Sequence, residues 1–376
     1  TEMARRVNRR KRRIRICILA AGCLAVMILL WAILSFLFHA LFPPKEVKQQ
    51  EVKKDKVVLT TAKQYRKYHV DESGNVPVMM YHGIHGEIQS KDTGNTGGNV
   101  DVDGYQRTAD AFEKDLEMYY KKGYRMIRLN DYLDGKIDVE AGKSPIVLTF
   151  DDGLENNIRV TGVDKNGELK IDPKSAVGIL EKFKKKYPDF HVTATFFITG
   201  GKFSQPKYDE KIIKWLIDHD YDVGNHTWNH PDFTELTTEQ ANEQVALVYD
   251  MLEEIIPGKY VNIVALPFGS PYKKDHETMP YVYDCTSEDK EYHTKCALQV
   301  AWEPDYSPYT VEFDPTFIKR IRAYDNNGTN FDIESTFQVL ESTRYISDGD
   351  EKTIVVPKEN KDRVDKTYKK RLKTYE

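Results

Sequence analysis

Short apolar runs alternate with helical segments along most of this chain of 376 residues, and no other feature constrains its fold as much. Runs rich in Val, Ile, Leu and Phe predict buried strands at residues 76–81, 146–150, 192–198, 261–266, 297–302 and 353–356. Apolar side chains at helical spacing predict helices at residues 108–122, 174–186, 211–219, 239–256 and 315–323. Strands that alternate with helices form parallel sheets covered by helices. The sequence therefore predicts an α/β fold, with a hairpin over residues 161–171 around Asn166-Gly167.

The N-terminal region has the pattern of a membrane anchor. Residues 1–15 carry eight Arg or Lys and one Glu, and residues 16–42 contain no Asp, Glu, Lys or Arg. A helix over residues 16–42 would be about 40 Å long, enough to cross the ~30 Å hydrocarbon layer of a membrane. The basic flank predicts an N-terminus in the cytoplasm. We expect a single-pass signal-anchor in a bacterial-type cell membrane, with the main domain extracellular; a cleaved signal peptide is the alternative.

The rest of the chain divides into three parts. Residues 43–75 are mostly charged and polar and are expected to be a stalk, residues 76–356 carry the alternating pattern of the main domain, and residues 357–376 form a charged C-terminal tail. Without its basic first segment the chain is acidic overall, which argues against nucleic acid as a partner. Cys285 and Cys296 lie in the expected extracellular part, where a disulfide between them and two free thiols are both open alternatives.

Four polar residues of the main domain have the types and spacing of a hydrolytic metal site. Asp151 and Asp152 follow the apolar strand at residues 146–150, and ligands of α/β folds gather at such strand ends. His226 and His230 are four residues apart, so they share one face of a helical turn. One carboxylate and two imidazoles form the ligand set of hydrolytic metal sites, with positions left for water and substrate. Each pair alone is a weak signal, because Asp-Asp-Gly also occurs in ordinary turns and histidines also occupy surfaces.

Three motifs in order give the sequence a specific resemblance. Thr149-Phe-Asp-Asp-Gly153, Thr193-Ala-Thr-Phe-Phe197 and Asn225-His-Thr-Trp-Asn-His-Pro-Asp-Phe233 together resemble the polysaccharide deacetylase family, carbohydrate esterase family 4. The resemblance covers residues 76–356 and implies a distorted (β/α) barrel. It further implies that Asp151 is the general base and that Asp152, His226 and His230 hold one divalent metal ion, most often Zn²⁺. A carboxylate beside such an ion can take a proton from its water, because metal binding lowers the pKa of that water.

The sequence departs from the family's third motif, Arg-Pro-Pro-Tyr-Gly, whose Arg orients the base. Residues 265–269 read Ala-Leu-Pro-Phe-Gly, so this Arg is missing, and Arg320 and Arg322 are the candidates to replace it. In the family, the backbone N–H at the aromatic position stabilises the oxyanion, and a backbone donor survives a change of side chain. The expected oxyanion and substrate pocket therefore consists of Pro267, Phe268, Gly269 and Trp302.

The family's last motif, a C-terminal Leu-x-His that supplies the general acid, is also missing, since no His follows His293. Val78-Met-Met-Tyr-His82 has the same pattern of aliphatic residues before a His. Extracellular poly-N-acetylglucosamine deacetylases resemble this arrangement, with circularly permuted motifs. His82 is therefore the expected general acid, because imidazole can protonate a leaving amine near neutral pH. This role requires residues 78–82 to lie beside residues 146–150 or across the barrel from them; a structural His at a strand end is the alternative.

The resemblance implies hydrolysis of N-acetyl groups on glucosamine units of a polysaccharide, either poly-N-acetylglucosamine or peptidoglycan. Two other functions stay open. The first is a glycan-binding pseudoenzyme, for which the missing motif Arg argues. The second is an O-deacetylase that acts on an acetylated glycan.

Overall fold

A computed structural model describes residues 57–86, 105–325 and 332–376, which belong to one compact unit, Lys56–Glu376. The expected basic segment at residues 1–15 and the expected membrane anchor at residues 16–42 lie outside the described residues. Within the three described ranges, no helix is both long and apolar enough to cross a membrane.

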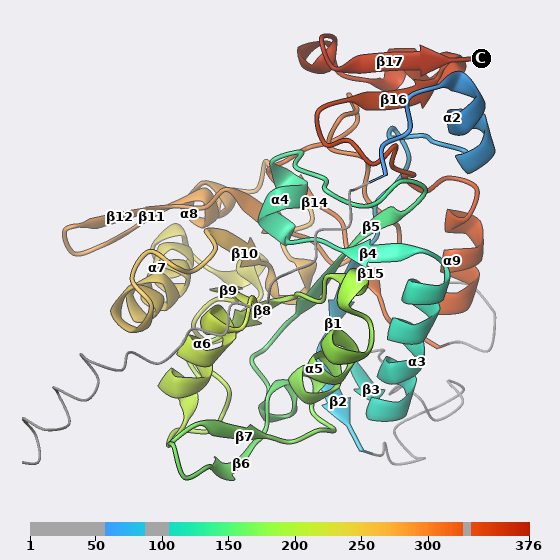
Figure 1. Ribbon diagram of the computed structural model, residues 1–376. Coiled ribbons are helices and arrows are strands. Elements are labelled where there is room, and N and C mark those ends of the chain that lie inside the picture. Colours follow the sequence, from blue (N-terminus) through green and yellow to red (C-terminus); the bar gives the residue numbers. More distant parts are fainter. Residues whose placement is uncertain (1–56, 87–104, 326–331) are drawn as a thin grey trace, which may run out of the picture. The chain divides into compact units, whose positions relative to one another are not determined.

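A parallel sheet forms the centre of this unit (Figure 1). Its strands are β1 (Val78–Tyr81), β4 (Tyr124–Met126), β5 (Ser144–Phe150), β8 (Thr195–Ile198), β9 (Asp222–Asn225), β10 (Ile263–Ala265), β13 (Cys296–Leu298), β14 (Phe317–Ile318) and β15 (Ile321–Arg322). Their order is β14-β13-β10-β9-β8-β5-β1-β15, with β4 beside β5. Every pair in this sheet is parallel, as the alternation of strands and helices predicted.

One short segment closes the sheet into a distorted barrel. β14 pairs with β13 at one end of the strand order, and β15 pairs with β1 at the other. Only Lys319 and Arg320 separate β14 from β15, so residues 317–322 bridge the two ends of the sheet. The helix predicted at residues 315–323 is therefore wrong. Its few apolar residues fit either periodicity, and pairing with two edge strands outweighs local propensity.

Helices cover the outside of the barrel (Figure 1). They are α3 (Ala109–Lys121), α4 (Leu129–Leu133), α5 (Ala176–Lys186), α6 (Asp209–Asp218), α7 (Thr238–Ile255), α8 (Met279–Tyr283) and α9 (Ile333–Leu340). The side chains of Thr108, Ser175 and Thr237 accept hydrogen bonds from the first turns of α3, α5 and α7, so each of these helices begins at a hydroxyl cap.

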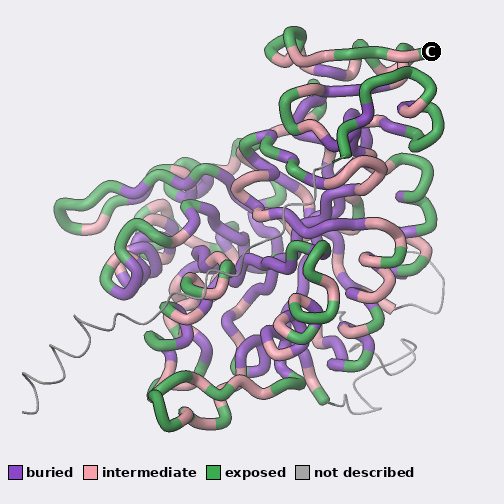
Figure 2. The backbone as a smooth tube through the Cα atoms, viewed as in Figure 1, coloured by how far each residue is buried: buried purple, intermediate pink, exposed green. Residues whose placement is uncertain are grey.

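The core lies between the sheet and the helices, where most residues are buried (Figure 2). Phe150 of β5 and Phe196 of β8 stack with their ring centroids 4.9 Å apart, and Tyr81 stacks on the other side of Phe150 at 5.4 Å. Aromatic pairs of this kind contribute beyond the area that they bury. This packing holds β1, β5 and β8 in register just below their carboxyl ends.

Small two-stranded sheets lie outside the main sheet. β2 (Gly83–His85) pairs with β3 (Gln106–Thr108), β6 (Val160–Val163) with β7 (Leu169–Ile171), and β11 (Asp284–Ser287) with β12 (Lys290–His293). The antiparallel pair β6–β7 confirms the hairpin predicted around Asn166-Gly167. Cys285 in β11 and Cys296 in β13 are buried free thiols, so the disulfide alternative is wrong.

The two ends of the described chain fold together. Residues 57–72 and 343–376, which we call the cap, include α2 (Ala62–Tyr68), β16 (Ile354–Pro357) and β17 (Leu372–Tyr375). Leu59, Tyr65 and Val70 pack against Val355, and β16 pairs with β17. Residues 57–72 of the expected stalk and residues 357–376 of the expected charged tail therefore belong to this folded cap. Scattered apolar residues among many charges concealed this small core in the sequence.

Candidate active site

The expected site residues meet at the carboxyl ends of neighbouring parallel strands. Asp151 directly follows β5, and His226 directly follows β9. β1 and β5 pair so that Tyr81 lies opposite Phe150, which makes the next residues, His82 and Asp151, neighbours. This is the position that the sequence required of His82, beside the strand that carries the two aspartates.

Three side chains form a cluster with the geometry of a metal site. The ligand atoms of Asp152, His226 and His230 all lie within 4.8 Å of one another. Asp152 Oδ1 lies 3.1 Å from His226 Nε2 and 3.4 Å from His230 Nε2. Ligand atoms bound at about 2.1 Å to one tetrahedral ion are about 3.4 Å apart. The spacing and the nitrogen and oxygen donors thus fit one divalent ion such as Zn²⁺.

Backbone contacts orient two of these ligands. His226 Nδ1 donates to the carbonyl oxygen of Ala265 over 2.8 Å, so the proton sits on Nδ1 and leaves the lone pair of Nε2 for an ion. Asp152 has a positive φ of 75°, which is uncommon outside glycine, and the next residue, Gly153, also has a positive φ of 65°. A Cβ at Gly153 would lie 2.0 Å from the carbonyl oxygen of Lys202, so only glycine fits this turn.

Asp151 forms a buried, two-pronged ion pair with Arg320. Arg320 Nη1 donates to Asp151 Oδ1 and Nη2 donates to Oδ2, each over 2.7 Å. Arg320 is fully buried and also donates to Thr149 Oγ1 and to the carbonyl oxygen of Gln299. The guanidinium of Arg320, from the segment that closes the barrel, thus contacts Asp151 in place of the motif Arg that residues 265–269 lack.

Both aspartates are held in their ionised form. Burial by itself would raise the pKa of Asp151, but the charges of Arg320 and His226 outweigh it, and the pKa lies below its usual value. Burial would also raise the pKa of Asp152. There the contact with His226 and the positive charges that the surrounding histidines carry at low pH outweigh burial, and the pKa is well below the usual range. At neutral pH, Asp151 can therefore accept a proton and Asp152 can bind a cation.

His82 follows β1, which lies on the other side of β5 from β9, the strand that His226 follows. His82 Nε2 is 4.0 Å from Asp151 Oδ2, and 8% of the residue is exposed. Burial lowers the pKa of His82 to about 4, although the charges of Asp151 and Asp152 oppose this change. The ring is therefore neutral at neutral pH.

The expected pocket residues are divided between two places. Pro267, Phe268 and Gly269 form a turn after β10, where the Phe268 ring packs edge-on against His230 at 4.7 Å. Phe268 has a positive φ of 57° and is 51% exposed. Trp302 lies instead in the segment between β13 and β14, where the guanidinium of Arg322 stacks on its ring at 4.6 Å. Arg322 also lies over the Tyr105 ring at 4.3 Å, so it orients this aromatic group, whereas Arg320 contacts Asp151.

Three further residues at the site escaped the sequence analysis. Thr149 Oγ1 donates to the carbonyl oxygen of Met79 and accepts from Arg320, which links β1, β5 and the closing segment. Asn157 Nδ2 donates to the carbonyl oxygen of His82, and the Tyr105 ring packs edge-on against the His82 ring at 4.7 Å. Thr149 belongs to a recognised motif and could have been noted, but Tyr105 and Asn157 lie outside the motifs on which the resemblance rests.

Part of the chain is similar to known proteins. Residues 138–281 match the Polysaccharide deacetylase family. The peptidoglycan-N-acetylmuramic acid deacetylase PdaC of Bacillus subtilis (strain 168) is 30% identical over 131 residues, which cover 35% of this chain and 23% of that protein. The peptidoglycan-N-acetylglucosamine deacetylase PgdA of Listeria monocytogenes (serotype 1/2a, strain 10403S) is 26% identical over 154 residues, which cover 39% of this chain and 27% of that protein.

Among solved structures, a polysaccharide deacetylase from Bacillus cereus aligns with 18% identity and a TM-score of 0.49, over 72% of this chain and 69% of that chain. The chain spans about a quarter of the length of the two curated relatives described above. The matched segment contains Asp151, the three ligands and the Phe268 turn, whereas His82 and Arg320 reach the site from either side of it. Residues 138–281 are thus similar to the Polysaccharide deacetylase family, and β1 and β15 extend the same sheet with residues from outside that segment.

Proposed function

We propose that this protein is a metal-dependent hydrolase that removes N-acetyl groups from amino-sugar units of a cell-wall or cell-surface polysaccharide. One observation carries the proposal: a three-ligand cluster, an ionised Asp151 and a buried His82 share one site at the strand ends. The names of two relatives support the substrate class, because PdaC is named for N-acetylmuramic acid and PgdA for N-acetylglucosamine, both in peptidoglycan. Peptidoglycan and poly-N-acetylglucosamine are the proposed substrates.

Asp152, His226 and His230 would hold the ion in this reaction. A divalent ion bound there supplies Lewis-acid chemistry, which polarises the acetyl carbonyl and lowers the pKa of a water molecule. Asp151 accepts the proton of the attacking water, and Arg320 fixes the direction of its carboxylate through two hydrogen bonds. The water oxygen forms the new bond to the acetyl carbon.

Departure of the amine requires a proton, and His82 is the group placed to give it. A neutral imidazole must first receive a proton, and Asp151 Oδ2 at 4.0 Å is the nearest group that has just gained one. His82 then donates this proton to the sugar nitrogen as the C–N bond breaks. The products are a free amine and acetic acid, which releases its remaining proton to water and becomes acetate, and both side chains return to their starting protonation states.

The turn at residues 267–269 is the proposed oxyanion donor. Its backbone N–H at Phe268 lies at the end of β10 beside the ligand His230, and the turn holds a left-handed conformation at Phe268. A preorganised backbone donor needs no reorganisation when charge develops on the carbonyl oxygen.

The pseudoenzyme alternative depended on the missing motif Arg. Arg320 supplies a guanidinium to the base from another strand, which removes that argument and favours turnover. The O-deacetylase alternative differs only in the leaving group, since an alkoxide takes the place of the amine.

Release of acetate from a panel of polymers tests the proposal. We expect acetate from N-acetylglucosamine oligomers or from peptidoglycan, and none in the presence of a chelator. Acetate from acetylated xylan but not from N-acetylated polymers would establish the O-deacetylase instead, and glycan binding without acetate release would establish the pseudoenzyme.

The extracellular location is part of the same proposal, since both substrates lie outside the cell. Protease added to intact cells that express the full chain should cleave the domain. Cleavage only after lysis would contradict this location.

A further inference from the structure

Charge is distributed unevenly between the cap and the rest of the domain. The cap carries 13 Lys and Arg against nine Asp and Glu, whereas residues 73–342 carry 29 against 46. Ten of the 13 cations of the cap are exposed, but only four of its nine acids are. Two of the buried or half-buried acids, Glu72 and Asp348, bond within the cap's interior. The accessible surface of the cap is therefore cationic on an otherwise acidic domain.

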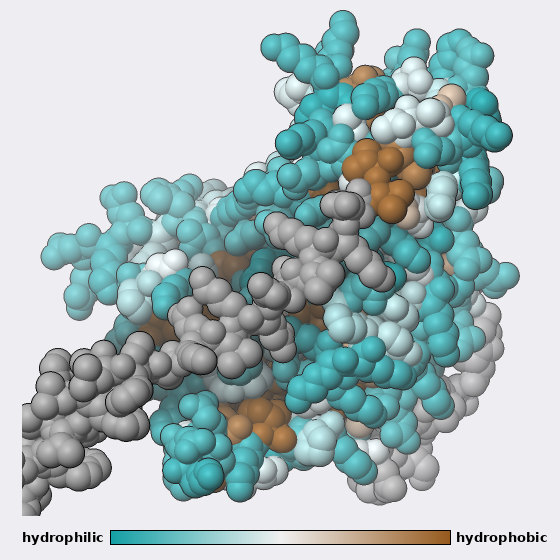
Figure 3. Space-filling view, in the orientation of Figure 1, coloured by the Kyte–Doolittle hydropathy of each residue, from teal (hydrophilic) through white to brown (hydrophobic). Residues whose placement is uncertain are grey.

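Exposed apolar side chains accompany these cations. Val57 is 66% exposed, Val58 is 39% exposed and Tyr68 is 40% exposed, and all three belong to the first segment of the cap. In Figure 3 the upper part of the molecule is mostly hydrophilic, and a hydrophobic patch lies at its edge. Lys and Arg combined with a few apolar and aromatic side chains are typical of surfaces that lie in a membrane interface.

The cap and the catalytic site lie at opposite ends of the barrel strands. Asp151 follows the carboxyl end of β5, whereas Gly142, which leads into the amino end of β5, donates to the carbonyl oxygen of Ser347 in the cap. β5 has seven residues, so these two ends are about 23 Å apart. A surface that touches the cap therefore leaves the catalytic end of the barrel facing the other way.

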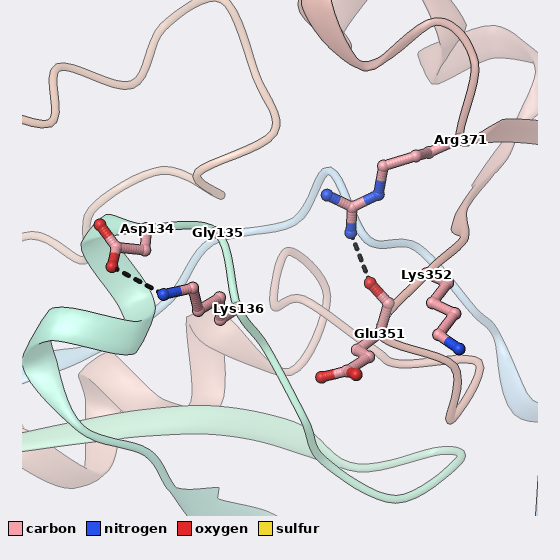
Figure 4. A pocket seen from close by; sticks show the side chains of 6 residues that line it. All are labelled: Asp134, Gly135, Lys136, Glu351, Lys352 and Arg371. Atoms are coloured by element: carbon pink, nitrogen blue, oxygen red, sulfur yellow. Dashed lines mark hydrogen bonds and ion pairs between the residues drawn. The ribbon is translucent and has the colours of Figure 1, made fainter.

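A hollow of about 460 Å³ lies where the cap meets the barrel (Figure 4). The cations Lys136, Lys352 and Arg371 surround it, together with Asp134 and Glu351. Lys136 pairs with Asp134 at 3.1 Å, and Arg371 donates to the backbone carbonyl of Glu351 and not to its carboxylate. The cationic character of the cap thus continues into the hollow.

The chain also enters the described unit through the cap. Only residues 43–56 separate the expected membrane span from Val57, and a fully extended chain of this length reaches about 50 Å. If residues 16–42 anchor the protein, the cap is the part of the domain tethered nearest to the lipid surface.

We propose that the cap docks on the surface of an anionic lipid bilayer, with its Lys and Arg at the phosphate headgroups and Val57, Val58 and Tyr68 in the interface. Docking directs the catalytic end of the barrel away from the membrane, toward a polymer in the wall. The value of that orientation rests on the proposed deacetylase function, but the docking itself does not.

Vesicle sedimentation tests the docking directly. The hydrophobic cores of the described chain form wholly within Lys56–Glu376, so residues 56–376 can be studied without the anchor. The test variant reverses four exposed charges of the cap, Lys366→Glu, Lys369→Glu, Lys370→Glu and Lys373→Glu. The control reverses four exposed charges in the hairpin, just before α5 and within α5, Lys165→Glu, Lys170→Glu, Lys174→Glu and Lys185→Glu, and has the same net charge as the test variant.

Vesicles of phosphatidylglycerol and phosphatidylcholine should bind the wild type, and pure phosphatidylcholine vesicles should bind it much less. Each cation near an anionic surface contributes roughly a fivefold factor to partitioning. The cap variant should therefore lose more than about tenfold in binding, while the control stays within about threefold. Added NaCl should weaken wild-type binding, because salt screens these charges.

Three results would overturn the docking. They are no wild-type binding to anionic vesicles, an equal loss of binding in both variants, and binding to soluble polyphosphate through the same lysines without binding to vesicles.

Thermal melting checks that each variant is folded; if charge reversal unfolds the cap, Lys→Gln at the same four positions replaces it. Acetate release from a soluble oligomer should be unchanged in the cap variant. If the protein binds vesicles as expected but releases no acetate from any substrate, the docking proposal stands and the proposed deacetylase function is wrong.

Discussion

Replacement of Arg320 by Met removes the partner of a buried carboxylate. Asp151 then loses two hydrogen bonds of 2.7 Å and the positive charge that offsets its burial. Breaking a buried ion pair at one partner costs about 3–5 kcal/mol, because the other charge stays buried and unpaired. An unfolding entropy of about 2.1 cal/mol/K per residue over the roughly 320 residues of Lys56–Glu376 converts this cost into a fall in Tm of about 5–7 °C.

The same change should alter catalysis in a specific way. Without the guanidinium, the pKa of Asp151 rises, so the base is ionised only at higher pH and the acid limb of kcat/KM moves to higher pH. Calorimetry and a pH profile of acetate release measure the two effects. Arg320→Lys is the matched control: it keeps a charge but cannot form the two-pronged pair, so it should lie between the wild type and Arg320→Met.

A double variant separates pairing from packing. Arg320→Met combined with Asp151→Asn removes both charges, so it should recover much of the Tm that Arg320→Met alone loses. A wild-type pH profile and a Tm within about 1 °C of the wild type in Arg320→Met would show that the ion pair neither stabilises the fold nor tunes Asp151. A double variant that loses the sum of the two single losses would show that the two charges do not interact.

Three further predictions address the ligands, the acid and the cap. His226→Ala should abolish binding of the metal ion, measured by elemental analysis, and full metal content in that variant would reject the ligand assignment. His82→Gln should keep the metal while kcat falls about 10²–10⁴-fold, and a fall of less than tenfold would assign the proton to another group. Burial raises the pKa of Glu72 from its usual 4.5 to about 8. Between pH 4.5 and pH 8, the Glu72 carboxyl group is therefore protonated in the folded cap but ionised in the unfolded chain. Stability should therefore fall as pH rises through that window, by about 5 kcal/mol at most, and Glu72→Gln should flatten this slope in melts at pH 5 and pH 9; identical slopes would contradict it.

Periodicity predicted the regular elements well and the short closing strands badly. α5 and α7 have long apolar faces and capping hydroxyls, so their ends agree with prediction within two residues. β14 and β15 have two residues each, too few for any period to appear in the sequence. Their pairing depends on both edges of the sheet, which only the folded chain brings together.

The site residues show the same difference between what the sequence predicts and what only the fold determines. Asp151, Asp152, His226 and His230 lie in motifs, and the structure gathers all four. Arg320 and Arg322 were equal candidates in the sequence, because residues two apart point to the same face of a regular strand and their spacing cannot distinguish them. The fold aims Arg320 into the barrel and leaves Arg322 against Tyr105 and Trp302.

Zinc titration of the metal-stripped protein is the most direct test of the central claim, that one ion held by Asp152, His226 and His230 enables Asp151 and His82 to remove an N-acetyl group. Acetate release from an N-acetylglucosamine oligomer should be absent after chelation and should rise in proportion to added Zn²⁺ until one ion is bound per chain. Full acetate release from protein shown by elemental analysis to contain no metal would contradict the account.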